Sequence, residues 1–219
     1  SSAASDVYKR QTLALLQGEI DWAGNFLPAI DRIFVERDPT HHNYWFPTMG
    51  ASVLLYPNHT KAPFDDVNVR KAISLSIDRE LLVKVALHNY VPPADESGLS
   101  NAYDKWRMED WGGRDKWARY NPERAEKLLD EAGWALIDGQ RQKDGQVLEL
   151  QVSVVSGWSD WVRAAQVVSR SLQEVGIQAT VLNQDFGSWF QRLQQGDFDL
   201  SLGWSEEGPH PIGFYESML

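Results

Sequence analysis

The sequence of 219 residues contains no cysteine, which excludes disulfides, thiol nucleophiles and zinc–thiolate sites. No stretch approaches the roughly 18 apolar residues of a membrane-spanning helix, so no segment is predicted to cross a bilayer. Positive charge is scarce, because Lys and Arg number 21 against 31 Asp and Glu, which gives a net charge of −10. Such a surface repels phosphate backbones and anionic lipids, so nucleic acids and membrane surfaces are poor candidates for direct ligands.

Catalytic and metal-binding signatures are missing as well. The sequence has no HExxH, GxSxG, Walker or GxGxxG motif. His41 and His42 diverge from one backbone and have no third ligand nearby, so we expect them in a solvated loop. Glu206-Glu207 alone is a weak signal for a pair of catalytic carboxylates. We therefore expect no catalytic residue, no metal site and no cofactor.

The first residues, 1–11 (SSAASDVYKRQ), resemble a translated sequencing adapter. Their reverse translation matches a transposase-based adapter, in frame, at every codon. We therefore expect residues 1–11 to have no evolved partner in the fold, and we set them aside from the fold prediction. On this interpretation the natural sequence starts inside a longer protein at Thr12 and stops inside it at Leu219. The lack of a signal peptide then says nothing about localisation.

Hydrophobic spacing and capping residues predict a mixed α/β chain. In the first part we expect a helix end at 12–17, strands at 19–22 and 51–56, a helix capped by Asp65 or Asp66, a helix at 79–87 after Asp78, and a helix from Pro122 to Gly133 capped by Asn121. In the last part we expect a strand at 147–155, a helix at 160–175 with Ser159 as its cap, a strand at 177–182, a helix at 188–195 and a strand at 198–203. This alternation predicts α/β packing with right-handed crossovers if the strands are parallel.

Tryptophan is unusually abundant, with ten residues in the chain. Three expected strands are followed by a polar turn that carries Trp, at residues 21–25 (DWAGN), 156–161 (SGWSDW) and 204–208 (WSEEG). Ligands of open α/β sheets bind outside the carboxyl ends of the strands, so two of these turns share one rim if their strands are parallel. The free N–H groups that begin the helix at 160 would point to the same rim.

Indole rings at such a rim suit a sugar ligand. An indole covers the apolar face of a pyranose, and nearby amide, hydroxyl and carboxylate groups bind its hydroxyl edge. The alternative for each Trp is an ordinary place in the core, and we prefer it for Trp117, Trp134 and Trp189. The candidate ligand-binding residues are Trp22, Asn25, Trp158, Ser159, Asp160, Trp161, Trp204 and Glu206.

Residues 62–87 (APFDDVNVRKAISLSIDRELLVKVAL) resemble the signature stretch of the family-5 extracellular solute-binding proteins of ABC importers, with Ser76 where Ala is usual. The likeness continues through 122–134, 172–181 and 196–204. The resemblance implies a two-lobed, periplasmic-binding-protein-like (type II) α/β fold that is present here only in part. Residues 12–58 would belong to the first lobe and 59–219 to a second lobe that is truncated at its C-terminus.

The resemblance also implies what the protein does. We expect a non-catalytic monomer, periplasmic or tethered as a lipoprotein outside the cytoplasmic membrane. It would capture a small molecule between its lobes and deliver it to an ABC permease in the membrane. The segments 21–25, 157–161 and 208–215 look like the branch that binds cellobiose-like, β-linked oligosaccharides.

Three other functions stay open. Peptide binders of this family usually carry an Asp shortly after the Gly-Trp of the last strand, where it holds the α-ammonium group of the peptide. Glu206 and Glu207 stand there in this sequence, so a peptide is the alternative ligand. A carbohydrate-active enzyme or a receptor-like sugar sensor would also be rich in Trp.

Overall fold

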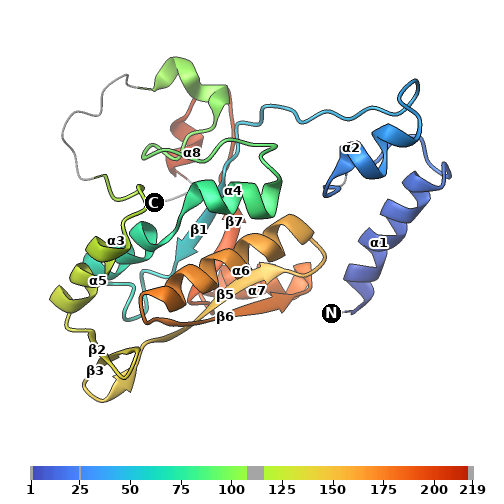
Figure 1. Ribbon diagram of the computed structural model, residues 1–219. Helices are drawn as coiled ribbons and strands as arrows, with labels where there is room; N and C mark the ends of the chain where they lie inside the picture. Colours follow the sequence, from blue (N-terminus) through green and yellow to red (C-terminus); the bar gives the residue numbers. More distant parts are fainter. Residues whose placement is uncertain (1, 25, 108–115, 217–219) are drawn as a thin grey trace.

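The computed structural model describes residues 2–24, 26–107 and 116–216, and most of them form one α/β unit (Figure 1). At its centre is a four-stranded sheet with the strand order β1-β7-β5-β6. The strands β5 (Glu149–Val155), β6 (Gln178–Gln184) and β7 (Leu200–Trp204) are parallel, while β1 (Val53–Pro57) runs antiparallel to β7. The mixed α/β fold predicted from the sequence is therefore confirmed, and the condition left open there is met, because these three strands are parallel.

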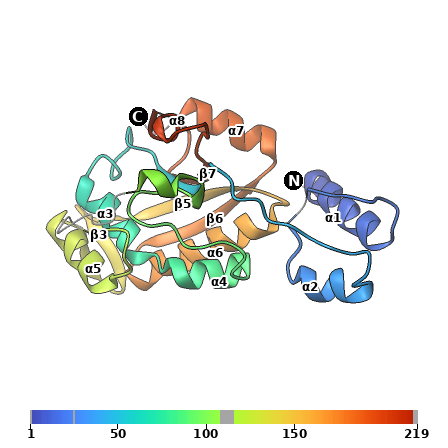
Figure 2. The same ribbon diagram turned by 90° about the horizontal axis from the view of Figure 1, so that it is seen from above.

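Helices cover both faces of this sheet (Figure 2). One face carries α3 (Val67–Ser76), α4 (Arg79–Leu87), α5 (Pro122–Glu131) and α6 (Ser159–Glu174), and the other carries α7 (Phe186–Gln195) and α8 (Ile212–Glu216). A single large core fills the unit, in which side chains of β5 and β7 pack against those of α6, as Val152, Leu172 and Leu200 do. Its burial of apolar area is the main force that holds the layers together.

The predicted helix ends are mostly correct because local side-chain bonds fix them. Asp66 accepts the backbone N–H of Asn68 at 2.8 Å and begins α3. Asp78 and Asn121 begin α4 and α5 in the same way, at 3.0 Å each. A side chain that accepts these otherwise unpaired N–H groups stabilises the first turn by about 1 kcal/mol.

Four local predictions are wrong. Residues 19–22 form an exposed irregular segment and no strand, since no described strand pairs with them. Ser159 is the first residue of α6 and not its cap. The cap position is occupied by Trp158, whose side chain makes no capping hydrogen bond. The helix expected at 188–195 starts at Phe186, and its cap is Asp185.

The fourth is the omission of a small antiparallel sheet. Its strands are β2 (Ala135–Ile137), β3 (Gln140–Lys143) and β4 (Gln146–Val147). Both of its turns are Asp-Gly pairs with positive φ, Asp138-Gly139 and Asp144-Gly145. Such pairs favour two-residue hairpins, and this signal was present in the sequence.

The N-terminal part lies to one side of the sheet (Figures 1 and 2). It contains α1 (Ser2–Leu16), the one-turn helix α2 (Ile30–Ile33) and the 3-10 turn η1 (Val35–Arg37). Its small core is separate from the large one and consists of Leu15, Leu27, Ile30 and Phe34. Residues 2–11 are helical and continue directly into the helix end expected at 12–17.

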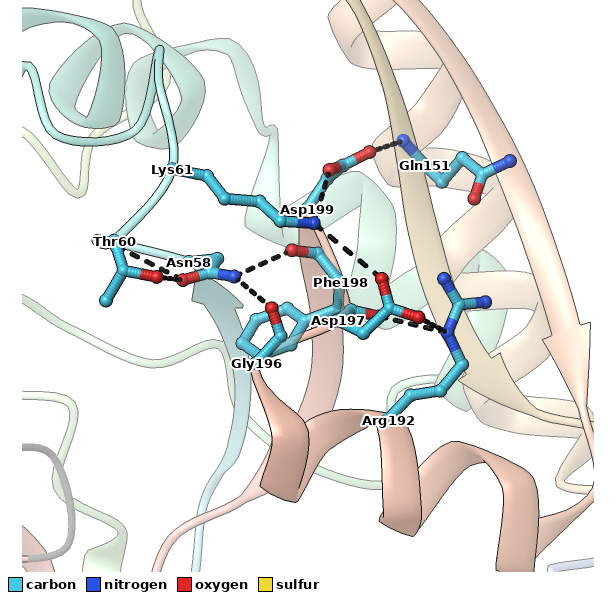
Figure 3. A network of polar contacts seen from close by, with 9 residues as sticks. All are labelled: Asn58, Thr60, Lys61, Gln151, Arg192, Gly196, Asp197, Phe198 and Asp199. Carbon is cyan, nitrogen blue, oxygen red and sulfur yellow. Dashed lines mark hydrogen bonds and ion pairs between the residues drawn. The ribbon is translucent and has the colours of Figure 1, made fainter.

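The amino end of β7 is fastened to the end of β1 by a polar network (Figure 3). The buried amide of Asn58 donates to the carbonyls of Gly196, at 2.7 Å, and Phe198, at 3.0 Å. Lys61 lies 3.7 Å from Asp199, whose other carboxylate oxygen accepts the backbone N–H of Gln151. The pairing of β1 with β7 puts residues 53–57 in the sheet of the expected second lobe, although they lie within 12–58.

Candidate functional site

Six aromatic side chains gather at the carboxyl end of the sheet, and we call this group the aromatic platform. They come from the turn after β5, the start of α6, the first half of α7 and the end of β7. The platform consists of Trp158, Trp161, Phe186, Trp189, Phe190 and Trp204. The structure therefore brings the two Trp-bearing segments after β5 and β7 to one rim, as their parallel strands predict.

The platform has a buried base and an open side. Trp189 is 2% exposed, and its indole N–H donates to the hydroxyl of Ser201 at 2.9 Å. Trp161 is also buried and meets Trp158 edge to face, with ring centroids 4.8 Å apart. Trp204 lies 5.6 Å from Trp189 and is 40% exposed, and Phe186 and Phe190 are exposed beside it. Exposed rings on a rigid base are suited to cover the flat apolar face of a ligand.

Polar groups border these rings at the start of α6. Asp160 lies in the first turn between Trp158 and Trp161, and Ser159 precedes it. Burial raises the pKa of the Asp160 carboxyl above its ordinary value, while the backbone N–H of Trp161 and the charge of Arg163 oppose that rise. The rim thus offers an acidic group within a largely apolar setting, next to the positive end of a helix.

The two glutamates after β7 differ in their surroundings. Glu206 is exposed, and its charge adds to burial in raising the pKa of Tyr56. Glu207 turns back to the chain, where its Oε2 accepts the backbone N–H groups of Gly50, at 2.8 Å, and Ala51, at 3.2 Å. The carboxylate of Glu207 is therefore used to hold the segment that enters β1.

Trp22, the candidate from the N-terminal part that the structure describes, is not joined to the platform. Trp22 is 79% exposed and folds over Gly24. None of the ring contacts among the described residues connects it to the platform. Asn25 lies outside the described residues. Of the eight candidates, the structure groups Trp158, Ser159, Asp160, Trp161 and Trp204, and places Glu206 two residues beyond Trp204.

The three Trp residues predicted to lie in the core differ in how far they are buried. Trp189 is buried, and Trp134 is half-buried against the large core. Trp117 is 42% exposed, so that prediction is wrong. It lies in the irregular segment before α5, where Lys116 and Arg119 are also exposed and no described element covers it.

Sequence reasoning missed four participants. Phe186, Trp189 and Phe190 follow the spacing of one helix face, so a predicted start of α7 at Phe186, with Asp185 as its cap, would have grouped them. Tyr8 is the fourth, since its hydroxyl accepts a hydrogen bond from the indole N–H of Trp158 at 2.7 Å. Nothing in the local sequence indicates a contact across 150 residues.

Residues 2–24, 26–107 and 116–216 contain neither a metal-binding cluster nor a membrane-spanning helix. No group of three or more His, Asp or Glu side chains there is arranged to hold a metal ion. His41 faces Asp38 at 2.8 Å, while His42 stacks on Phe34 with the ring centroids 4.1 Å apart. His42 is thus not simply solvated, as expected, but packed. No helix in the described part of the chain is long and apolar enough to cross a membrane.

Several known proteins are similar to this chain in fold and sequence. A nickel-binding periplasmic protein of Escherichia coli K12 is 25% identical over 215 residues, which are 95% of this chain and 40% of that protein. The periplasmic oligopeptide-binding protein of the same organism is 26% identical over 215 residues. The match covers 92% of this chain and 36% of that protein. A mannohexaose-bound periplasmic oligopeptide-binding protein of Thermotoga maritima matches with a TM-score of 0.80 and 26% identity, covering 95% of this chain and 40% of that one.

The chain thus spans about two-fifths of the length of these relatives. They are described as binding proteins of the periplasm and not as enzymes. Residues 7–219 match the family described as bacterial extracellular solute-binding proteins, family 5 Middle. The chain belongs to this family-5 group of bacterial extracellular solute-binding proteins.

Proposed function

We propose that this chain is part of the ligand-capturing component of an ABC importer, and that it works as a monomer outside the cytoplasmic membrane. The family match over residues 7–219 carries the proposal. The first lobe would contain the small N-terminal core, and the second lobe the sheet. Because β1 pairs with β7, we place the division before Val53 and not after residue 58. Residues 1–11, as an adapter translation, would belong to neither.

The ligand that the platform suits best is a neutral, β-linked oligosaccharide of the cellobiose type. The observation that carries this choice is the exposed side of the platform, where Trp204, Phe186 and Phe190 offer flat apolar faces. Ser159 and Asp160 lie at its edge, where they would bind hydroxyl groups of the sugar. Trp22 and Asn25 would approach from the first lobe when the lobes close, and Glu206 would lie at the margin. The mannohexaose complex of the similar Thermotoga maritima protein supports a sugar as ligand.

A peptide remains the second candidate, since the oligopeptide-binding relatives favour it. A peptide needs a carboxylate for its α-ammonium group, and Glu207 would be the acid after the last strand. Its carboxylate already accepts the N–H groups of Gly50 and Ala51, however. A partner that replaced these bonds would leave two backbone donors to be satisfied elsewhere, which is costly. This favours the sugar.

A titration of the full-length protein with cellohexaose, mannohexaose and a hexapeptide tests the proposal. We expect the hexasaccharides to change the Trp fluorescence in a saturable way, and chromatography to recover the sugar uncleaved. Saturable binding of the peptide without binding of either sugar would overturn the ligand assignment. Shortened sugar in the recovered fraction would show an enzyme and overturn the function as a whole.

A further inference from the structure

One residue of the N-terminal helix already contacts the platform. The hydroxyl of Tyr8 accepts the indole N–H of Trp158 at 2.7 Å, and both side chains are half-buried. In both views the N-terminal end of α1 lies beside the carboxyl ends of β5 and β6 (Figures 1 and 2). A six-membered ring that bears a neutral hydroxyl therefore occupies part of the rim.

This contact is isolated from the rest of the helix. Val7, Lys9, Arg10 and Gln11 are exposed, and the first buried residue of α1 among those with described side chains is Leu15, in the separate N-terminal core. A single hydrogen bond to a neutral partner shifts an equilibrium only severalfold. The helix is therefore held at Trp158 weakly enough for a ligand to displace it.

The indole of Trp158, in contrast, is fixed in direction. Its ring meets Trp161 edge to face at 4.8 Å and lies 6.0 Å from both Phe186 and Trp204, measured between ring centroids. These neighbours on α6, α7 and β7 hold the ring so that the N–H points to the place of the Tyr8 hydroxyl. A donor with a fixed direction selects ligands by the position of their acceptor oxygen.

We propose that the indole N–H of Trp158 is a specificity-determining donor of the site and that Tyr8 occupies the position of a ligand hydroxyl in cis. The proposal rests on the sugar-binding function given above. A ligand must then present a neutral hydroxyl at the edge of a ring that packs on the platform, and it must displace Tyr8. The required hydroxyl defines the ligand class more narrowly than stacking on the platform does. Because the ligand must also displace Tyr8, α1 lowers the affinity of this chain for its ligand.

The contact can be tested without any ligand. In a proton–nitrogen spectrum of the chain, the indole N–H signal of Trp158 is identified as the one that is lost in Trp158→Phe. We expect Tyr8→Phe to shift that signal, because it removes only the accepting oxygen. Tyr215→Phe is the matched control, since the Tyr215 hydroxyl bonds the carbonyl of Ser97 instead. An unmoved Trp158 signal in Tyr8→Phe would mean that the contact does not form and would overturn the proposal.

The competition is tested with cellohexaose as the probe. The affinity should rise about three- to tenfold in Tyr8→Phe, stay unchanged in Tyr215→Phe, and fall in Trp158→Phe. In the double variant Tyr8→Phe, Trp158→Phe the gain should vanish, because the donor that Tyr8 occupied is gone. Equal or lower affinity in Tyr8→Phe would overturn the proposal. A shifted Trp158 signal with no binding of cellohexaose to any variant or to the full-length protein would instead show that the sugar function itself is wrong, and the ligand class with it.

Discussion

The two ends of the central sheet are built from the same strands but differ in their chemistry. At the amino end of β7, the polar atoms bond to one another, and the side chain of Asn58 alone makes four hydrogen bonds while the residue is 5% exposed. At the carboxyl end, the side chains are aromatic, and Trp204 stays 40% exposed. The polar end is closed upon itself, whereas the aromatic end keeps surface free for another molecule. We infer that the first end serves stability and the second serves binding.

The largest expected loss of stability is at Trp189, which is buried but belongs to the platform proposed to bind the ligand. Its ring is buried under Trp204, and replacing it with Ala should lower the free energy of unfolding by about 3–5 kcal/mol. Urea denaturation followed by circular dichroism measures this loss. Trp117→Ala is the control, because that ring is exposed and its loss should cost far less. Similar small losses for both variants would contradict a buried base of the platform.

Asn58→Ala should break the polar end without affecting the other. The carbonyls of Gly196 and Phe198 lose their donor, and the unfolding free energy should fall by about 2–3 kcal/mol. The exposed Asn183 provides a matched Asn→Ala control with little expected change. Calorimetric melting gives the stability, and titration with cellohexaose should show unchanged affinity for the folded fraction. If Asn58→Ala kept its stability but lost affinity for cellohexaose, the inference that the polar end serves stability and the aromatic end serves binding would be wrong.

Trp204→Ala should have the opposite signature. Removal of a stacking ring should weaken sugar binding by about 2 kcal/mol, roughly thirtyfold, with only mild loss of stability, since the ring is partly exposed. Isothermal titration of the full-length protein with cellohexaose checks this. The control is Trp106→Ala, an exposed Trp outside the platform. An unfolded Trp204→Ala protein, or one with normal affinity, would show that the platform is structural.

Asp160 makes the carboxyl end sensitive to pH. Because burial raises its pKa in the folded state, the folded protein binds this proton more tightly than the unfolded chain does. Its ionisation therefore lowers stability as pH rises from the ordinary aspartate pKa through the raised value. Asp160→Asn should remove this loss of stability, so the variant should melt at a higher temperature than the unchanged protein at neutral pH. The difference in melting temperature should disappear below the ordinary pKa range of aspartate. Melting curves over that range check the sign, and a gap that widens on acidification would refute it.

The smallest effect is expected from deletion of residues 1–11. None of residues 7–11 is buried, and Tyr8 makes one hydrogen bond to the sheet unit, so the melting temperature should change by only a few degrees at most. The comparison is with Leu15→Ala, which removes a side chain from the N-terminal core. A larger loss on deletion than in Leu15→Ala would show that residues 1–11 are an evolved part of the fold.

The sequence predicted those features that depend on neighbours along the chain. Caps such as Asp66 and Asn121 act within one helical turn, so their role is legible without the fold. The meeting of Trp158 and Trp204 could also be predicted, because parallel strands end at one rim. These successes concern position in the chain and in the sheet, and not the use of the site.

Features that depend on distant partners could not be predicted. Residues 19–22 have strand-like spacing but no strand to pair with, and spacing alone does not supply one. The exposure of Trp117 depends on whether an element happens to cover it. The bond between Tyr8 and Trp158 requires the placement of a whole helix. A wrong start for α7 also separated Phe186 from the other rings of the platform.

Residues 50–53, which lead into β1, are bound to the residues at the end of β7, and this attachment limits where the chain can bend. Val53 pairs with Trp204, Ser52 and Ser205 exchange hydrogen bonds, and Glu207 holds Gly50 and Ala51. The chain that leaves the N-terminal part is thus fixed to the residues that flank the platform, so a hinge between the proposed lobes would lie before Gly50. A pivot set so close to the rings has a short lever arm. On the two-lobed proposal, turning about this pivot would change the angle at which the first lobe meets a bound molecule far more than it would change their separation.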